Sequence, residues 1–323
     1  EGYESSNPNT HLGAISVNGN PWNLSTSTIN NVEKKDLYVD LTKGISLAHT
    51  RNYRGYKFLG FWLEETELGQ TPTLTTDQVN AISETNPIIA KYEVIPGEVT
   101  LFYDDDAFSY RIPAIAKTST GRLIAVTDYR HNLDDLGRDN HGTGTHRIDL
   151  VMRYSDNDGE TWSDIQTIVA GTGISGANDC GYGDAAIATV GNKVLVMAAA
   201  GDVIYPGGTA ENPNRMARIY STDNGATWHI EEMTRKMYAD KNSLIPDGVS
   251  SFFGSGKLAV DPDFNGTGKA RIYGAVLIKN AVRTDNNYVV YTDDLGANWH
   301  ILGGSQTPVA FASEPKVDIL PNG

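Results

Sequence analysis

The chain has 323 residues, of which 39% are hydrophobic and 20% charged. That length predicts about two domains. The 26 basic and 40 acidic residues give a formal net charge of −14, which argues against nucleic acid or an anionic membrane surface as a partner, because both need clustered Lys and Arg. No run of 18 apolar residues occurs, so no membrane-spanning helix is expected. The single cysteine, Cys180, excludes an intrachain disulfide and is interpreted as a small buried residue.

Residues 1–96 are predicted to form a small, mostly-β N-terminal region. Residues 1–18 are polar and are expected to be a poorly ordered lead. From the run 14–17 to the run 61–63, short apolar stretches alternate with turn residues, and those at 37–41 and 57–63 predict strands. Residues 75–82 predict one short helix with a hydroxyl or Asp cap at its start.

The boundary of this region is placed near Pro96, where Pro96-Gly97 interrupts the chain. The region contains Trp22, Trp62 and several tyrosines. Two interpretations follow: these aromatics belong to a carbohydrate-binding module, or they fill the core of a small β structure.

From residue 97 to 323 short strands alternate with turns, and helical periodicity is almost absent. The apolar runs 114–116, 123–126, 150–152 and 194–197 predict buried strands.

One eight-residue turn occurs three times in this second part of the chain. A repeat of several strands closed by the same turn predicts a β-propeller, with each copy marking one blade. The copies span residues 155–162, 221–228 and 292–299, and their final tryptophans are 66 and 71 residues apart.

The composition of the recurring turn explains its geometry. Glycine at the fifth position supplies a backbone conformation that other residues resist. Aspartate at the third position bonds nearby amides, and Asn157, which replaces it in the first copy, offers the same local bonds. The tryptophan is expected to fold back into the blade. These aspartates are therefore expected to hold turns rather than to act as catalytic acids.

A specific combination of residues precedes the first turn. It consists of Tyr110-Arg111-Ile112-Pro113, then Arg130 nineteen positions after Arg111, then Asp135 five positions further on. At these residues, together with the recurring turn (the Asp-box), the chain resembles the bacterial exo-sialidases, the retaining enzymes that use a tyrosine nucleophile. The resemblance runs from about Pro96 to the end of the chain.

The resemblance implies a fold, an activity and a location. The expected fold is an all-β, six-bladed β-propeller, of which residues 97–323 supply the first half to two-thirds. The expected activity is hydrolysis of terminal sialic acid from glycoproteins, glycolipids and oligosaccharides, without a cofactor. The expected location is secreted, periplasmic or on the surface of a bacterial cell.

Two arginines are candidate substrate-binding residues. The planar guanidinium of Arg111 suits a carboxylate, which it binds through two parallel charge-assisted bonds. In the resembling family the matching arginine belongs to a triad that grips the carboxylate of the sugar, so a locally basic site forms within an acidic protein. By the same resemblance Arg130 binds near the ring hydroxyls. The alternative for Arg130 is a surface salt bridge to Asp128 or Asp134.

Three acidic residues complete the candidate site. Asp135, on a loop beside the arginines, is the candidate general acid/base, with Asp134 as the alternative. By resemblance Glu314 polarises the nucleophile. Asp184, in a Gly-Tyr-Gly-Asp segment, contacts the acetamido or hydroxyl groups of the substrate by resemblance, and a role in a turn is the alternative.

The nucleophile itself is expected to be a tyrosine. The anomeric carbon of sialic acid already carries a carboxylate, so a phenol approaches it with less repulsion than a second carboxylate would, and sialidases are the known exception among glycosidases in this respect. The tyrosine and the other two triad arginines are expected beyond Gly323.

No metal is expected. Residues 261–266 begin like a calcium loop, but the twelfth position is Ile272 and no helices are expected to flank it, so a strand connection is favoured. Asp139, His141 and His146 match no zinc spacing and are interpreted as loop residues.

Three rival functions remain open. A trans-sialidase or an intramolecular trans-sialidase shares every residue named above and differs only in its products. A non-catalytic glycan-binding propeller has no use for the proton donor Asp135. An unrelated Asp-box propeller does not account for the Tyr-Arg-Ile-Pro segment.

Overall fold

The computed structural model describes the chain in two compact units, residues 1–103 and residues 104–323. The boundary predicted near Pro96 and the strand predicted over 37–41 lie outside the described residues. No helix among the described residues is long and apolar enough to cross a membrane. The description excludes residues 1–2, 5–6, 12, 19, 22–24, 30–31, 37–43, 53–55, 84, 95–98, 105–107, 139, 141–145, 283, 305–308, 311–312 and 321–323.

The first unit is built from short antiparallel sheets. Strand order is β10-β7-β3-β4 in one sheet and β11-β8-β9 in another, and the pairs β1-β2 and β5-β6 stand alone. The elements are β1 (Tyr3–Glu4), β2 (Asn7–His11), β3 (Gly13–Val17), β4 (Asn20–Pro21), β5 (Ser25–Ile29), β6 (Val32–Asp36), β7 (Ile45–Asn52), β8 (Tyr56–Leu63), β9 (Thr66–Gly69), β10 (Thr73–Leu74), α1 (Thr76–Ala81) and β11 (Ile88–Val94).

The prediction of a poorly ordered lead is wrong for residues 13–17. Strand β3 pairs with β7, and Val17, opposite Leu47, is only 4% exposed. The apolar run at 14–17 is the part of the lead that pairs, because the partner strand supplies hydrogen bonds and burial.

The predicted short helix is present as α1. Thr75 accepts a hydrogen bond from the amide of Gln78, whose side chain accepts one from the amide of Thr75, so a capping box starts the helix.

The core of the first unit is small and partly aromatic. Phe58 and Phe61 lie in it, and Trp62 is half-buried with the Lys91 ammonium 4.7 Å from its ring centroid. Neither phenylalanine is among the aromatics to which the core interpretation refers, so that interpretation stays a prediction. Trp22 lies outside the described residues, and the carbohydrate-binding alternative stays a prediction.

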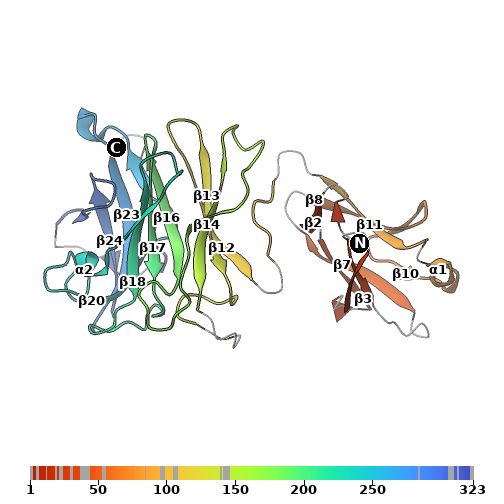
Figure 1. The fold of residues 1–323 in the computed structure, drawn as a ribbon. Helices are drawn as coiled ribbons and strands as arrows, with labels where there is room; N and C mark the ends of the chain where they lie inside the picture. Colours follow the sequence, from red (N-terminus) through yellow and green to blue (C-terminus); the bar gives the residue numbers. More distant parts are fainter. Residues whose placement is uncertain are drawn as a thin grey trace. The chain divides into compact units, whose positions relative to one another are not determined.

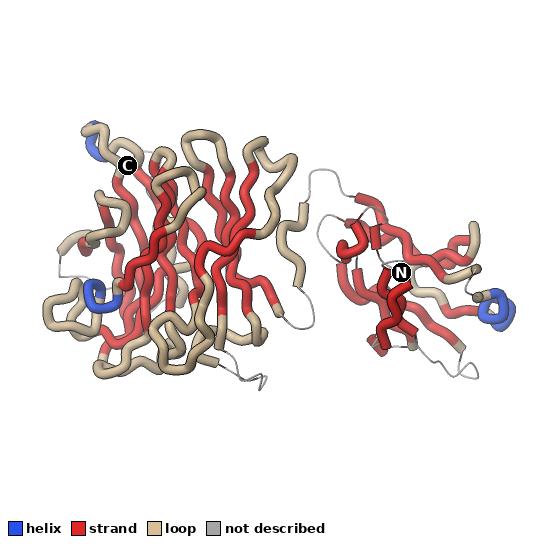
Figure 2. The backbone as a smooth tube through the Cα atoms, in the orientation of Figure 1, coloured by secondary structure: helices blue, strands red, loops and turns tan. Residues whose placement is uncertain are grey.

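The second unit is all-β, as predicted, and its sheets are the blades of a propeller. Blade 1 has strand order β12-β13-β14-β15, and blade 2 has order β19-β18-β17-β16 with β21 added in parallel to β16. Blade 3 has order β20-β23-β24-β25, with β22 and β26 at its edges. Figure 1 shows the three sheets one after another, from yellow through green to blue, and Figure 2 shows the loops gathered at the two ends of the strands.

The strand bounds agree with the apolar runs from which buried strands are predicted. Two short helical segments, α2 (Thr234–Met237) and a 3-10 turn (Phe264–Gly266), interrupt the β structure. The strands are β12 (Ser109–Lys117), β13 (Leu123–Arg130), β14 (Ile148–Ser155), β15 (Gln166–Val169), β16 (Tyr182–Val190), β17 (Lys193–Ala200), β18 (Arg215–Ser221), β19 (His229–Glu232), β20 (Gly248–Phe253), β21 (Gly256–Lys257), β22 (Ala259–Asp261), β23 (Arg271–Asn280), β24 (Asp285–Thr292), β25 (His300–Ile301) and β26 (Val309–Ala310).

Neighbouring blades pack face to face through two apolar cores. One core combines residues of blades 1 and 2, such as Ile124 and Ile187, and the other combines residues of blades 2 and 3, such as Met197 and Val276. All four side chains are fully buried. Burial at about 25 cal/mol per Å² of apolar surface makes these interfaces the main source of stability.

The three Asp-boxes have the same hydrogen bonds, as their composition predicts. In the second box the Ser221 hydroxyl accepts from the amides of Asp223 and Gly225, and the Asp223 carboxylate accepts from the amide of Thr227. In the first box the side-chain oxygen of Asn157 accepts from the amide of Thr161 at 3.0 Å. The exchange of Asp for Asn therefore leaves the turn intact.

The register places the Asp-boxes and Arg130 at opposite ends of the blades. In blade 1, Leu123 at the start of β13 lies opposite Ser155 of the box, whereas Arg130 at its end lies opposite Ile148. We call the two ends the box end and the site end. In blade 2, Asp184 lies near the site end of β16, and Val194 lies opposite Ser221 at the box end.

Candidate active site

The site end of blades 1 and 2 contains a fully buried carboxylate, Asp128, on β13. Its Oδ2 accepts hydrogen bonds from Nη2 and Nε of Arg130 at 2.9 and 3.3 Å. Its Oδ1 accepts one from the amide of Asp184 at 3.1 Å. Asp128 therefore ties the second strand of blade 1 to the first strand of blade 2.

The close approach of the two blades depends on Gly183. A Cβ atom at that position would lie 2.9 Å from Oδ2 of Asp128, closer than real Cβ contacts come. Burial and the nearby charge of Asp184 raise the pKa of Asp128 well above its usual value, while Arg130 acts in the opposite direction. From the sequence, Asp128 is predicted only as a possible ion-pair partner of Arg130. The spacing of two residues along β13, which puts both side chains on one face of the sheet, is the sequence feature that indicates this pair.

Arg130 is the basic centre of the cluster. Its side chain is 5% exposed, and its Nη2 lies 2.9 Å from Asp128, 3.3 Å from Asp135 and 4.0 Å from Asp184. Of the two ion pairs weighed for Arg130, the one with Asp128 forms, and it is buried rather than on the surface. Direct contact of Arg130 with a sugar stays a prediction.

The structure distinguishes Asp135 from Asp134. The Asp135 side chain is 46% exposed, and its Oδ1 accepts from the amide of Leu136 and faces Arg130. Asp134 is 7% exposed, and its two oxygens accept from the amide and the side chain of Asn140. Asp134 therefore holds the loop, while Asp135 is open to a ligand.

Asp184 is the second partly buried carboxylate of the cluster. The pKa of Asp184 is raised to about 6, mainly by burial and then by the negative charge of Asp135. The charge of Arg130 lowers this pKa, and the charge of Glu314 raises it further. Glu314 is exposed, and it influences Asp184 through its charge although 130 residues separate the two in the sequence. Asp184 lies within β16 and not in a turn, so the turn alternative is wrong.

Three candidate positions share an unusual backbone geometry. Ile112, Asp184 and Glu314 have positive φ values of 56°, 56° and 55°. At the first two the strand register shifts, between Arg111 and Ala114 in β12 and between Gly183 and Ala186 in β16. Such bulges redirect side chains, and left-handed non-glycine residues cost about 1–3 kcal/mol each and gather at functional sites.

Arg111 lies beside this cluster. It is the register partner of Asp128, and directly opposite residues of an antiparallel pair present their side chains on the same face of the sheet. The Arg111 residue is exposed, and its guanidinium makes no hydrogen bond or ion pair with the described residues. It is therefore a cation available at the site end.

Among the described residues, no group of three or more His, Cys, Asp or Glu side chains is arranged to bind a metal ion. In the segment that resembles a calcium loop, the Asp261 carboxylate accepts from the amide of Asp263. His146 is described, whereas Asp139 and His141 lie outside the described residues.

The fold and the site together define a β-propeller chain with Asp-boxes at one end and a charged cluster at the other. The family model for the BNR/Asp-box repeat matches residues 219–229. A sialidase of Paraclostridium sordellii is 26% identical over 235 residues, which cover 69% of this chain and 54% of that protein. A sialidase of Micromonospora viridifaciens is 29% identical over 226 residues, which cover 65% of this chain and 33% of that protein.

The chain is thus similar to bacterial sialidases, and it spans about half or less of the length of these curated relatives. Among solved structures, a Hadza microbial sialidase is similar at 23% identity and a TM-score of 0.48, over 62% of this chain and 37% of that one.

Proposed function

We propose that the protein is an exo-α-sialidase that hydrolyses terminal sialic acid from glycoproteins, glycolipids and oligosaccharides with retention of configuration. The observation that carries the proposal is the cluster at the site end, in which Arg130 joins Asp128 and Asp135 and lies beside Asp184. Its curated relatives are named sialidases. Such substrates lie outside cells, so we also propose a secreted, periplasmic or cell-surface bacterial location.

Asp135 is proposed as the general acid/base. The leaving oxygen must gain a proton, and Asp135 is the acid of the loop that is both exposed and held in place, by Arg130 and by the amide of Leu136. General-acid assistance of this kind contributes roughly 10²–10⁴-fold.

Arg111 is proposed to bind the carboxylate of the sugar. Its guanidinium is exposed, and it is suited to a bidentate ion pair. In the same proposal Asp184 contacts the acetamido or hydroxyl groups. Because its pKa is about 6, part of the Asp184 population carries a proton near neutral pH, and a neutral carboxyl donates a hydrogen bond without repelling the carboxylate of the substrate.

Glu314 is proposed to take the proton of a tyrosine nucleophile. The charge of Glu314 adds to the rise in the pKa of Asp184, which supports a place for Glu314 near that carboxylate. A phenol that loses its proton only as it attacks avoids the repulsion that a carboxylate nucleophile would meet at this substrate.

Product analysis tests the proposal. The full-length protein is incubated with sialyllactose, with and without excess lactose as an acceptor, and the sialic acid products are separated. Free sialic acid, lost in Asp135→Asn and Glu314→Gln variants, is the expected result. A transferred sialoside or an anhydro sugar would assign the trans-sialidase alternatives. Binding without any product, unchanged in Asp135→Asn, would assign a glycan-binding propeller.

A further inference from the structure

Blades 1 and 3 share an arginine–aspartate pair at the box end. In blade 1, Arg122, just before β13, donates Nε and Nη2 to the two carboxylate oxygens of Asp156 at 2.7 and 2.8 Å. In blade 3, Arg271 donates the same two groups to Asp293 at 2.7 Å each. Asp156 and Asp293 are the second residues of their Asp-boxes, and both guanidiniums also lie over aromatic rings. We call this arrangement the clasp.

Blade 2 keeps the cation of the clasp and lacks its carboxylate. Val194 lies opposite Ser221, as Leu123 lies opposite Ser155 in blade 1, so Lys193 and Thr222 take the places of Arg122 and Asp156. The Lys193 ammonium is exposed and makes no hydrogen bond or ion pair with the described residues.

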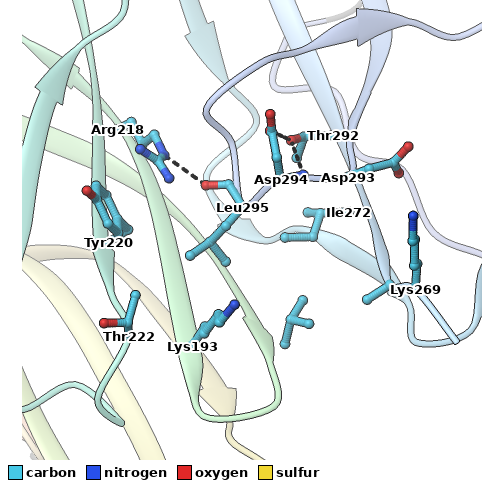
Figure 3. A pocket seen from close by; sticks show the side chains of 12 residues that line it. Lys193, Arg218, Tyr220, Thr222, Lys269, Ile272, Thr292, Asp293, Asp294 and Leu295 are labelled. Carbon is cyan, nitrogen blue, oxygen red and sulfur yellow. Dashed lines mark hydrogen bonds between the residues drawn. The ribbon is translucent and has the colours of Figure 1, made fainter.

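A cavity of about 480 Å³ opens at the position of the absent clasp, between blades 2 and 3 (Figure 3). This volume lies within the usual range for small-molecule sites. Lys193 and Thr222 line it from blade 2, and Lys269, a second exposed lysine, lines it from the loop before β23. Lys269 also makes no side-chain ion pair or hydrogen bond with residues that the structure describes.

The other charged groups of the wall are already engaged. Arg218 donates to the carbonyl of Leu295 at 2.8 Å and pairs with Glu231 at 2.9 Å. The Asp293 carboxylate is held by the clasp of blade 3, and the Asp294 carboxylate accepts hydrogen bonds from Thr292 and Asn298 of its own Asp-box. Two ammonium groups, of Lys193 and Lys269, and two hydroxyls, of Thr222 and Tyr220, therefore remain for a ligand.

We propose that this cavity binds the carboxylate of a small sugar acid, which takes the place of the aspartate that the second Asp-box lacks. The two lysines supply point charges, and the Thr222 hydroxyl supplies a hydrogen-bond donor. The cavity lies at the opposite end of the blades from Asp135, so its ligand does not compete with a substrate at the candidate active site.

Titration with glucuronate tests the site. This sugar acid carries the carboxylate but is not a sialic acid, and glucose is the neutral control. With full-length protein labelled with ¹⁵N, glucuronate should shift the amide signals of the second Asp-box saturably, with a dissociation constant of about 1–10 mM. The Asp135→Asn variant should bind equally well. Added salt should weaken binding, because the contacts are ionic.

Two variants give the sharpest comparison. Thr222→Asp restores the missing carboxylate, which pairs with Lys193, and should abolish glucuronate binding while the protein stays folded. Lys193→Gln should weaken binding roughly tenfold. The control is Lys241→Gln, which alters an exposed lysine on another loop and should leave binding unchanged. Unaltered binding in Thr222→Asp, or signal shifts away from the second Asp-box, would overturn the proposal. Equally tight binding of galactose 6-sulfate would overturn the specificity for a carboxylate and show that the site accepts any oxyanion.

Discussion

Asp184→Asn should make the protein more stable at neutral pH, because the native residue is ionised there at a cost. The pKa of Asp184 is about 6, against an ordinary value of 3.8, so the folded state favours the protonated carboxyl by about 2 units. At 1.36 kcal/mol per unit this corresponds to about 3 kcal/mol of differential free energy. Asparagine carries no charge and tolerates the φ of 56° at this position.

The net gain should be smaller than that figure. The figure already includes the attraction between Arg130 and Asp184, which lie 4.0 Å apart, but asparagine is an imperfect substitute for the protonated carboxyl. We expect an increase of about 1–2 kcal/mol in the free energy of unfolding at pH 7, which for a unit of this size corresponds to a rise in Tm of roughly 4 °C.

The sign of the pH dependence follows from linkage. Between pH 4 and pH 6 the folded state binds more protons at Asp184 than the unfolded state does, so this residue's contribution to stability is fully present near pH 4 and is lost as the pH rises through 6. The variant should therefore match the native protein at pH 4 and exceed it at pH 7.

Differential scanning calorimetry at the two pH values measures the effect, with the exposed loop variant Asp164→Asn as a control that shows no such difference. A gain of equal size at both pH values, or a loss of stability at pH 7, would refute the electrostatic reasoning.

The remaining predictions concern the same cluster. Asp128→Ala leaves Arg130 buried without its main partner and should lower the free energy of unfolding by about 3–5 kcal/mol in urea titrations; a loss below about 1 kcal/mol would contradict the role of the buried pair. Gly183→Ala should lower both stability and activity, because its Cβ would lie 2.9 Å from Asp128; full retention of both would show that the two blades can separate there. Asp135→Asn should lower kcat on sialyllactose by roughly 10²–10⁴-fold and much less on an activated aryl sialoside, whose leaving group needs little protonation. Equal losses on both substrates would remove Asp135 from the role of acid, whereas Asp134→Asn should lower stability without this dependence on the leaving group.

The blade architecture could be predicted from the sequence because its signals are local. Each Asp-box carries its own hydrogen bonds within eight residues, and apolar runs such as 194–197 form strands whose burial follows from composition alone. The helix after Thr75 was likewise predictable, since its capping box lies within four residues.

The parts that the sequence could not predict depend on contacts between distant segments. The burial of Asp128 follows from the packing of Gly183 and the amide of Asp184 against it, some 55 residues away. Which of Asp134 and Asp135 is open to a ligand depends on which carboxylate accepts the hydrogen bonds of Asn140. The order in strand β3 depends on its pairing with β7, whose residues lie thirty or more positions further along the chain. The absence of the clasp from blade 2 follows from the strand registers, which show that Lys193 and Thr222 are equivalent to the paired residues of blades 1 and 3.

The most direct test of the central claim is the configuration of the first product. Proton NMR of the full-length protein acting on sialyllactose records which anomer of sialic acid appears before mutarotation mixes the two. The account predicts that the α-anomer is released first and that Asp135→Asn suppresses its appearance. Initial release of the β-anomer, or no release of sialic acid at all, would contradict a retaining sialidase built on this cluster.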